Sequence, residues 1–539
     1  MSIDLKMISN KLNQAIARGA FAEALDHGVT LLRQNPTNRL ALNLCAEMAV
    51  KAGQPVKALS FLRQAEEMNL CTPMHDVLTA EAMLAQGDRK QAQKLAAHAV
   101  SNVAKAHDVL ERLGYFLSVK CENHEAALKA YEKSVALQPA NARSWYNLGA
   151  EQRFLGQLDD AEISWNKAID LGFEDSEILL LRAQLRRKDE ENNDIADLTQ
   201  RLAKAPETTT MWMHLHYALA KEYEDIGDYP RSFSHLQQGS DARRKRIKYD
   251  VQDDLSVMQQ ISDSFDADIA NLRDTSLGDA CQREGAIFIV GLPRTGTTLV
   301  ERILSSHAKV ESLGELNDFA VHLTRIIAAG GASPQSRSEL VKASLEIDFN
   351  SLGDAYMQSI QSRRSGTHPS GTDMLIDKLP LNFLYCGLIK RALPQAKIIH
   401  LTRHPMDTIY AIYKQLFKSA YPMSYHLEEL TRYYIGYRQL MAHWEKLLPG
   451  EIFHLGYEQL VTHQEDKTRA LLDYLGLPWD PACLQFHKNA DASTTASATQ
   501  IRQPVYASSM GKWENYSQQL APVADMLKQA GIDQETWEI

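Results

Sequence analysis

The sequence has few cysteines and no two of them in a redox or metal-binding spacing. Six cysteines are scattered over 539 residues, with no CxxC pair. Disulfide frameworks and zinc sites both need clustered cysteines. We therefore expect reduced, mostly buried thiols in a cytoplasmic protein, and neither a disulfide frame nor a metal site.

Long apolar runs are also missing. No run reaches the roughly 18 apolar residues that a membrane-spanning helix needs. The N-terminal stretch MSIDLKMISNKLNQ lacks the apolar segment of a signal peptide. We expect neither a membrane span nor a cleaved leader.

An excess of positive charge is absent as well. The net charge is −10 and the isoelectric point is near 6.0, which disfavours broad binding to nucleic acids or to anionic membranes. A local exception is the basic run DARRKRIKYD at 241–250. A solvated helix face is favoured there over a nuclear-targeting or nucleic-acid-binding segment.

What the sequence does contain is, first, an internal repeat in its N-terminal half. A Gly stands five residues before an Ala at Gly19, Gly53, Gly87 and Gly156, and these glycines lie 34, 34 and 69 residues apart. The interval of 69 hides one more unit, with Glu122 at the glycine position. A period near 34 is typical of tetratricopeptide repeats, so we expect a solenoid of about seven helix pairs.

The small residues of this repeat have a packing explanation. Gly and Ala allow the two helices of a repeat to approach closely, and large apolar residues fill the space to the next pair. Such arrays present a curved surface that binds peptides or a protein partner. The alternative is an array that only packs on its own catalytic domain or mediates a homo-dimer.

The C-terminal half has a different pattern. Short β-branched runs at 286–290, 374–376, 396–401 and 451–455 alternate with helical stretches. This alternation predicts a parallel sheet flanked by helices, with ligands at the carboxyl ends of the strands. At a length that calls for more than one domain, we expect a repeat array at 1–245, a linker helix at 246–283 and an α/β domain at 284–539.

The stretch GLPRTGTTLVERIL, residues 291–304, directly follows the first of these strands. Gly291 and Gly296 let backbone N–H groups turn toward an anion, and the start of the next helix adds its positive end. Thr297 stands where a nucleotide triphosphatase has its loop lysine, and Arg294 lies within the loop. This predicts a phosphate-type site that is not built for ATP hydrolysis; the alternative is a tight turn without a ligand.

Two further cations follow predicted strands. Arg403, in KIIHLTRHPMD, can grip a second phosphate bidentately. The alternative is a structural ion pair with Asp407 or another carboxylate. Lys378 follows another strand and is expected to point toward the site, with an ordinary surface lysine as the alternative. Together these residues indicate a nucleotide with phosphates at two separate places.

The motifs PRTGTT and RHPMD resemble the 5′-phosphosulfate and 3′-phosphate motifs of sulfotransferases. The likeness is closest to protein-tyrosine sulfotransferases, covers roughly 284–515, and combined with the repeats it resembles a bacterial group of fused proteins. The segments that carry it are PRTGTTL (293–299), GYEQLV (456–461), LGLPW (475–479) and SATQIRQPVYASSMGKW (497–513).

The resemblance implies 3′-phosphoadenosine 5′-phosphosulfate as the sulfuryl donor, with no metal, and it implies roles for individual residues. Glu315 is the implied base, and Arg294 and Lys378 are implied to stabilise the transferring group. The implied donor-binding residues are Arg294, Thr295, Gly296, Thr297, Thr298, Arg403, Tyr457, Ser497 and Lys512.

The sequence departs from the family at two positions. Ala411 stands where the family has a Ser eight residues after the 3′-phosphate Arg, and Asn317 stands where the tyrosine enzymes have an Arg that recognises acidic peptides. Tyr410, Tyr413 or Lys414 are candidates to compensate for the lost hydroxyl. Rival bases are His307 and His404, and the alternative for Glu315 is a surface or helix-capping acid.

The resulting prediction is a sulfotransferase acting on a hydroxyl, first a protein or peptide tyrosine, with the array recruiting the acceptor or a partner. Three alternatives stay open: a carbohydrate or small-phenol sulfotransferase, a magnesium-dependent kinase or nucleotide triphosphatase, and a non-catalytic scaffold.

Overall fold

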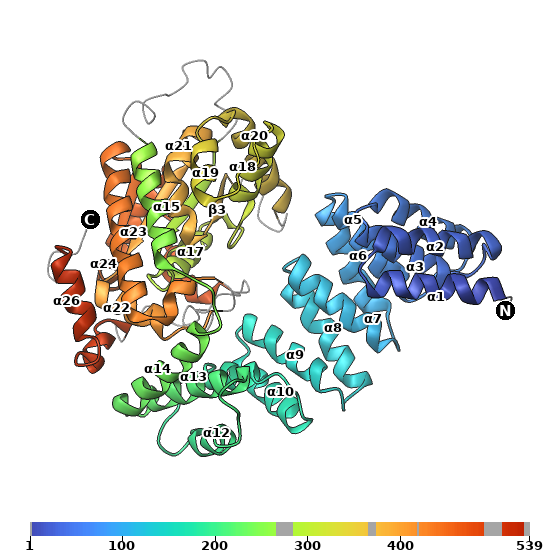
Figure 1. The fold of residues 1–539 in the computed structure, drawn as a ribbon, viewed down its shortest axis with the longest axis horizontal. Helices are drawn as coiled ribbons and strands as arrows, with labels where there is room; N and C mark the ends of the chain where they lie inside the picture. Colours follow the sequence, from blue (N-terminus) through green and yellow to red (C-terminus); the bar gives the residue numbers. More distant parts are fainter. Residues whose placement is uncertain (1–2, 266–283, 365–372, 418–419, 490–508, 533–539) are drawn as a thin grey trace. The chain divides into compact units, whose positions relative to one another are not determined.

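The computed structural model describes residues 3–265, 284–364, 373–417, 420–489 and 509–532 (Figure 1). The chain divides into two compact units, Met1–Glu174 and Asp175–Ile539. The helix pairs continue past this division as far as α14 (Tyr229–Arg244), so the last pairs belong to the same compact unit as the sheet.

In the part of the first unit that the structure describes, consecutive helices pack against one another in pairs. The last turn of α7 continues as a π-helical segment, Phe116–Lys120. The helices are α1 (Ile3–Ala17), α2 (Phe21–Gln34), α3 (Arg39–Lys51), α4 (Pro55–Glu67), α5 (His75–Ala85), α6 (Arg89–Asn102), α7 (His107–Tyr115), α8 (His124–Leu137), α9 (Ala142–Phe154) and α10 (Leu158–Asp170).

The repeated alanines and glycines have different functions in this packing. The alanines at 24, 58, 92, 127 and 161 are fully buried between helices, as expected. The explanation by close packing is wrong for the glycines at 19, 53, 87, 156 and 227. They have φ between 69° and 92°, and a Cβ added there would meet nothing within 4 Å. These glycines are needed because the turn between the helices passes through the left-handed region.

Close helix approach requires a different glycine, Gly149 on α9. A Cβ at this position would lie 2.4 Å from Cδ1 of Trp165, which is wholly buried on α10. The indole Nε1 donates a hydrogen bond to the carbonyl of Tyr146 at 3.1 Å. The side chain of Trp165 on α10 therefore fills the space that Gly149 leaves on α9.

The second unit begins with further helices: α11 (Glu177–Ala183), α12 (Ile195–Leu202), α13 (Thr210–Asp225), α14 and α15 (Val251–Ser264). The expected linker helix is α15, which packs along α23 (Leu427–Leu447) and is part of the domain. Residues 266–283 lie outside the described part of the chain.

The basic run at 241–250 is only partly the solvated face that the sequence predicts. Arg244 is half-buried and forms an ion pair with Glu429 on α23, at 2.6 Å. It also donates to the carbonyls of Ile247 and Tyr249. Lys245, Arg246 and Lys248 are exposed. The run therefore joins the last repeat helix to the C-terminal domain.

All four predicted strands are present in one parallel sheet, in the order β2-β3-β1-β4-β5. The sequence analysis missed β2, which is only three residues long. The predicted combination of a helical repeat array with a parallel α/β domain is confirmed. The strands are β1 (Ala286–Gly291), β2 (Val310–Ser312), β3 (Met374–Asp377), β4 (Lys397–Thr402) and β5 (Ile452–Gly456).

Apolar side chains on these strands form a core with the helices around them. Ile287, Ile399 and Leu401 are wholly buried against Val300 and Ile303 of α17. The helices of this domain are α17 (Thr297–Ser305), α18 (Asp318–Ala329), α19 (Arg337–Ala343), α20 (Phe349–Arg363), α21 (Cys386–Ala392), α22 (Pro405–Tyr413), α23, α24 (Tyr457–Thr462), α25 (Gln464–Leu475) and α26 (Ala521–Gln529), with 3₁₀ segments at Pro380–Tyr385, Pro422–Tyr425, Pro481–Lys488 and Lys512–Tyr516.

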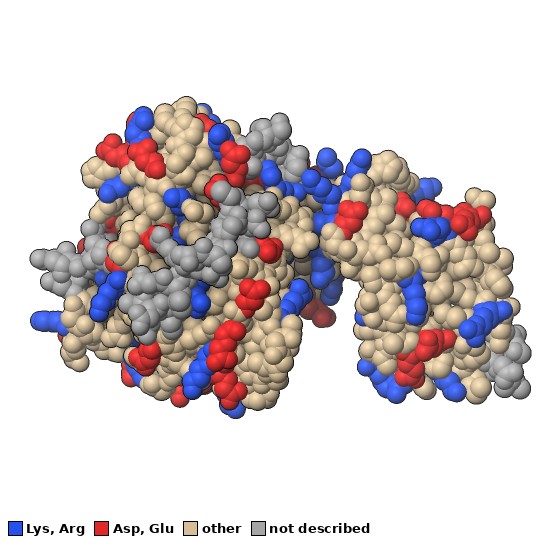
Figure 2. Space-filling model, turned by 90° about the horizontal axis from the view of Figure 1, so that it is seen from above, with Lys and Arg blue, Asp and Glu red and all other residues tan. Residues whose placement is uncertain are grey.

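The surface reflects the charge balance of the sequence. On the face shown in Figure 2, Lys and Arg side chains are interspersed with Asp and Glu. In the described residues, none of the helices is both long and apolar enough to cross a membrane.

We predict that Glu122→Gly stabilises the array locally. Glu122 occupies the repeat's glycine position with φ of 57°, and its side chain is exposed. The free energy gained by relieving this strain should exceed the entropic cost of glycine. The free energy of local opening of α8 should therefore rise by roughly 0.5–1 kcal/mol, which slows its hydrogen exchange. Glu122→Ala keeps the strain and should show no such slowing. Faster exchange in Glu122→Gly would contradict this explanation.

Candidate functional site

The loop between β1 and α17 is shaped by two glycines that tolerate no side chain. A Cβ on Gly291 would lie 2.8 Å from the carbonyl oxygen of Leu401 on β4, and one on Gly296 would lie 2.6 Å from the ring of Tyr457. Thr295 closes the turn by donating to the carbonyl of Leu292 at 2.8 Å. The loop is therefore held against the ends of both neighbouring segments.

The backbone of this loop turns its amides toward the start of α17. Arg294 has φ of 69° and Gly296 has φ of 100°, and Gly296 precedes the first residue of the helix. Thr297 and Thr298 open the helix and are buried. Successive N–H groups at a helix N-terminus, together with two hydroxyls, form the concave, positive surface that binds a phosphate-type group.

Arg403 connects this loop to three other segments. It follows β4, and its guanidinium donates to the carbonyls of Arg294 at 3.0 Å and of Ser509 at 2.6 Å. It lies over the ring of Tyr457, 4.9 Å from the ring centroid. The hydroxyls of Tyr457 and Ser509 are 2.6 Å apart. Four segments that are distant in sequence thus meet at one side chain.

Asp407 forms hydrogen bonds with backbone N–H groups instead of the ion pair with Arg403 that was the alternative. Its carboxylate accepts from the backbone N–H of Gly511 at 2.7 Å and of Trp513 at 3.3 Å. These bonds hold the C-terminal segment that carries Ser509 and Lys512 against α22. Asp407 therefore positions the segment whose Ser509 carbonyl contacts Arg403.

The residues fit an anionic nucleotide because one polar atom of Arg403 has no partner in the described part of the chain. Its side chain is 8% exposed, and Nε makes no hydrogen bond within the described residues. A buried guanidinium N–H without an acceptor is costly, so such groups are usually satisfied by a ligand or water. A phosphate beside Arg403, Tyr457 and Ser509 would supply the acceptor.

Lys378 and Glu315 form the second group of the site. Lys378 follows β3, is 1% exposed and forms an ion pair with the carboxylate of Glu315. Glu301 of α17 lies 3.7 Å from the same ammonium. Burial lowers the pKa of Lys378, but Glu301 and Glu315 outweigh burial and leave the pKa above its ordinary value. Lys378 is therefore a buried ammonium, and the alternative of a surface lysine is wrong.

The side chain of Glu315 is 48% exposed, in contrast to its partner. Its carboxylate is thus accessible to a molecule in solution while it contacts a buried cation. This arrangement suits a base that accepts a proton from a bound hydroxyl. Asn317 lies two residues further on, immediately before α18.

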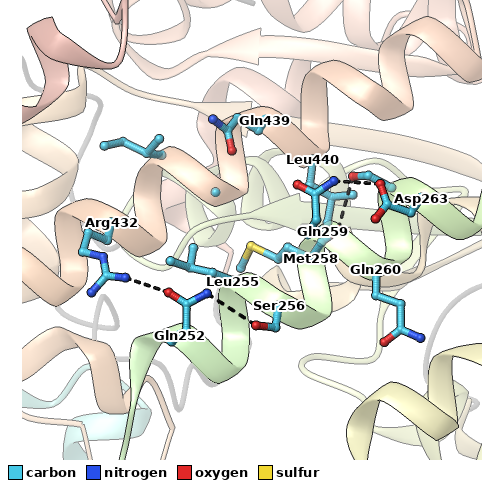
Figure 3. A pocket seen from close by; sticks show the side chains of 13 residues that line it. Gln252, Leu255, Ser256, Met258, Gln259, Gln260, Asp263, Arg432, Gln439 and Leu440 are labelled. Carbon is cyan, nitrogen blue, oxygen red and sulfur yellow. Dashed lines mark hydrogen bonds between the residues drawn. The ribbon is translucent and has the colours of Figure 1, made fainter.

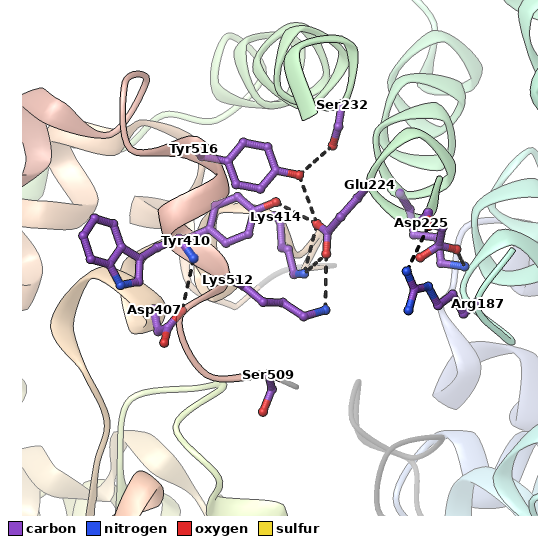
Figure 4. Close-up of polar contacts among 12 residues, drawn as sticks. Arg187, Glu224, Asp225, Ser232, Asp407, Tyr410, Lys414, Ser509, Lys512 and Tyr516 are labelled. Carbon is purple, nitrogen blue, oxygen red and sulfur yellow. Dashed lines mark hydrogen bonds and ion pairs between the residues drawn. The ribbon is translucent and has the colours of Figure 1, made fainter. Parts of the chain in front are cut away.

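Lys512, the last donor-binding candidate, lies three residues after Ser509, whose carbonyl Arg403 contacts, and it belongs to a polar cluster around Glu224 (Figure 4). Its ammonium is 3.5 Å from the carboxylate of Glu224 on α13. Lys414, at the end of α22, is 2.9 Å from the same carboxylate. Ser497, also predicted to bind the donor, lies outside the described residues.

The two histidines considered as rival bases have structural contacts. His307 is buried, with Nε2 3.0 Å from the carbonyl of Pro478 and Nδ1 accepting from the backbone N–H of Lys309. His404 stacks on Trp513, with ring centroids 5.6 Å apart. Burial lowers the pKa of His404.

Sequence reasoning missed three contributors: Glu301, Glu224 and Ser509. Glu301 lies one helical turn into α17, and the hydroxyl of Ser312 donates to it at 2.6 Å. Its position after the phosphate loop was a usable signal. No sequence signal pointed to Glu224, because it belongs to a repeat helix that is distant in sequence from the α/β segment.

A groove elsewhere in the domain does not contain these residues. It lies between α15 and α23, has a volume of about 570 Å³, and is lined by side chains such as Gln252, Leu255 and Arg432 (Figure 3). Arg432 donates to the amide oxygen of Gln252 at 2.9 Å across it. The described residues contain no cluster of three or more His, Cys, Asp or Glu that could hold a metal ion.

Segments in both halves of the chain match models of known protein families. Residues 286–481 match the sequence model of the sulfotransferase family, and residues 107–141 and 130–163 match models of the tetratricopeptide repeat. These assignments agree with the folds of the corresponding segments.

Individual relatives share more limited similarity. An "Uncharacterized protein" of Aquifex aeolicus (strain VF5) is 32% identical over 320 residues, which cover 58% of this chain and 41% of that protein. The chain thus matches less than half the length of this relative. Protein-tyrosine sulfotransferase 1 of Danio rerio is 26% identical over 268 residues, 46% of this chain and 72% of the relative. The sulfotransferase domain from the curacin biosynthetic pathway aligns with 46% of this chain and 98% of its own, at 18% identity and a TM-score of 0.32.

We predict that Gly296→Ala weakens binding of adenosine 3′,5′-bisphosphate by at least about tenfold, because the new Cβ must displace the Tyr457 ring and strain the loop. Isothermal titration calorimetry measures the effect. The matched control is Gly450→Ala, which has a similar strain at φ of 74° but no collision. Equal affinity in Gly296→Ala and the wild type would show that the loop does not contact the nucleotide.

Proposed function

Because residues 286–481 form a sulfotransferase-family domain in a chain that also carries tetratricopeptide repeats, we propose that the protein transfers a sulfuryl group from 3′-phosphoadenosine 5′-phosphosulfate to an acceptor hydroxyl. The observation that carries the donor assignment is Arg403. Its buried guanidinium bridges the anion loop and the C-terminal segment, and one of its N–H groups has no partner among the residues that the structure describes.

The loop and its neighbours would bind the two phosphate ends of such a donor. The amides of the loop, Arg294 and the hydroxyls of Thr297 and Thr298 would hold the phosphosulfate end. Arg403 and Tyr457 would hold the 3′-phosphate end. The donor supplies an activated sulfuryl group, so the protein's contribution is positioning and charge complementarity, by analogy with phosphoryl transfer.

Glu315 would then act on the acceptor hydroxyl, and Lys378 on the oxygen that leaves with the donor nucleotide. The half-exposed carboxylate of Glu315 accepts the proton of the acceptor hydroxyl. Lys378 is held as an ammonium in a buried position, where a fixed charge acts strongly on the developing negative charge of the leaving oxygen. Arg294 contributes a second cation from the loop.

For the acceptor we propose a tyrosine in a peptide or protein. The similarity to proteins named protein-tyrosine sulfotransferases supports this choice. Asn317, in place of the arginine that the resemblance implies, disfavours a requirement for acidic peptides. We propose that the repeat array recruits the acceptor or a partner. The cytoplasmic location and a homo-dimer stay predictions.

The experiment that tests the donor assignment is a calorimetric titration with adenosine 3′,5′-bisphosphate, and with ADP and ATP in the presence of magnesium. Magnesium-independent binding of the bisphosphate alone is the expected result. Preference for magnesium–ATP would indicate a nucleotide triphosphatase, and binding of no nucleotide would indicate a scaffold. Radiolabelled sulfate transfer to tyrosine peptides, carbohydrates and small phenols then identifies the acceptor class.

We predict that Arg294→Ala abolishes transfer with the fold intact. The substitution removes a cation from the loop that is proposed to bind the phosphosulfate end. The measurement is sulfate transfer, with far-ultraviolet circular dichroism as the check on folding. Full activity in a folded Arg294→Ala variant would refute the assignment of the loop.

We predict that Glu315→Gln lowers kcat by about 10²–10⁴-fold through loss of the base, while the affinity for adenosine 3′,5′-bisphosphate changes little. Glu301→Gln is the matched control, because Glu301 also faces Lys378 but is not proposed to accept a proton. A loss in Glu301→Gln as large as that in Glu315→Gln would favour a purely electrostatic role for both carboxylates.

A further inference from the structure

The last repeat helices reach the candidate donor pocket through one carboxylate. Glu224, near the end of α13, accepts from the hydroxyl of Tyr410 at 2.7 Å and from the ammonium of Lys414 at 2.9 Å. Lys512 lies 3.5 Å away. Figure 4 shows the two lysines converging on this side chain from α22 and from the segment after Ser509.

This carboxylate is held firmly in its ionised form. Its side chain is 16% exposed, and Tyr516 contributes a second phenol at 3.5 Å. Burial by itself raises the pKa of Glu224, but the charges of Lys414 and Lys512 outweigh burial and hold the pKa at about 2. The cluster thus contains one fixed anion and two ammonium groups.

Lys414 is placed to serve the same site as Arg403. Arg403 lies two residues before α22, and Lys414 caps the C-terminal end of this helix. Ala411 and Lys414 are three residues apart, so they lie on the same face. Burial lowers the pKa of Lys414, Glu224 raises it, and Lys512 and Arg294 lower it further. Lys414 and Lys512 contact the same carboxylate of Glu224, and the segment before Lys512 is held by Arg403 through the carbonyl of Ser509. These contacts place Lys414 beside the Arg403 site, three residues after the position where the family's serine is missing.

We propose that Lys414 binds the 3′-phosphate of the donor in place of the missing serine, and that Glu224 is its counter-ion only until the nucleotide binds. This inference rests on the proposed function. A phosphate dianion competes with a single carboxylate for the same two lysines. Removal of the carboxylate charge should then strengthen nucleotide binding, whereas removal of the Lys414 charge should weaken it.

The first experiment compares two nucleotides on the same variants by calorimetry without magnesium. Lys414→Met should bind adenosine 3′,5′-bisphosphate about tenfold or more weakly, with no comparable change for adenosine 5′-monophosphate, which lacks the 3′-phosphate. Lys414→Arg keeps the charge and should retain most of the affinity. Equal losses for both nucleotides, or no loss, would overturn the assignment of Lys414.

The second experiment tests the counter-ion. Glu224→Gln keeps the shape and one acceptor oxygen, and should bind the bisphosphate about tenfold more tightly, because a nearby negative charge is gone. In the Lys414→Met background this gain should shrink. The matched control is Glu429→Gln, which removes the Arg244 ion pair between α14 and α23 but does not touch the lysines. It should leave the affinity unchanged.

The outcomes separate this inference from the proposed function. If the wild type binds the bisphosphate but Glu224→Gln binds equally or more weakly, Glu224 is not a displaceable counter-ion. A gain in Glu429→Gln equal to that in Glu224→Gln would assign the effect to general loosening of the repeat end. If the wild type binds no bisphosphate, both the donor assignment and the role of Lys414 are wrong.

Discussion

The C-terminal domain depends on a buried guanidinium that donates its hydrogen bonds to backbone carbonyls in the described residues, with the carboxylate of Glu458 acting on it electrostatically. Arg403 donates to two backbone carbonyls, from the anion loop and from the segment that contains Ser509, and packs over Tyr457. Removing a charge from water is expensive unless it is compensated. The buried charge lies at the carboxyl end of β4, beside the loop after β1 and the start of α24. An anion-binding site at this place is the physical reason for keeping the cation.

The sheet order explains why these groups meet. β1 lies between β3 and β4, and β4 pairs with β5, all in parallel. The carboxyl ends of four strands therefore lie along one edge and deliver the anion loop, Lys378, Arg403 and Tyr457 together. The same geometry buries Lys378 and leaves Glu315 half-exposed, so a fixed positive charge is placed beside a carboxylate that solvent molecules can reach.

The last repeat helices and the α/β domain form one compact unit. The compact unit that contains the sheet begins at Asp175 and includes α13 and α14. Two polar contacts explain this: Arg244 with Glu429, and Glu224 with Lys414 and Lys512. Loss of one partner of a buried ion pair is destabilising, because the other charge is left buried without compensation. The end of the array is thus bound to the domain by charges that need each other.

Local patterns were sufficient for much of this description. The 34-residue period and the alternating β-branched runs predict the helix pairs and four of the five strands, because both reflect spacing within a short segment. The anion loop is likewise a local feature. The strand at 310–312 was missed because three residues carry no pattern, and the turn glycines were explained wrongly because positive φ and close packing look alike in a sequence. The contacts of Glu224 and of Arg403 join residues about a hundred to nearly three hundred positions apart. Only the path of the chain in three dimensions decides such pairs, because charge and burial become complementary after the elements have packed.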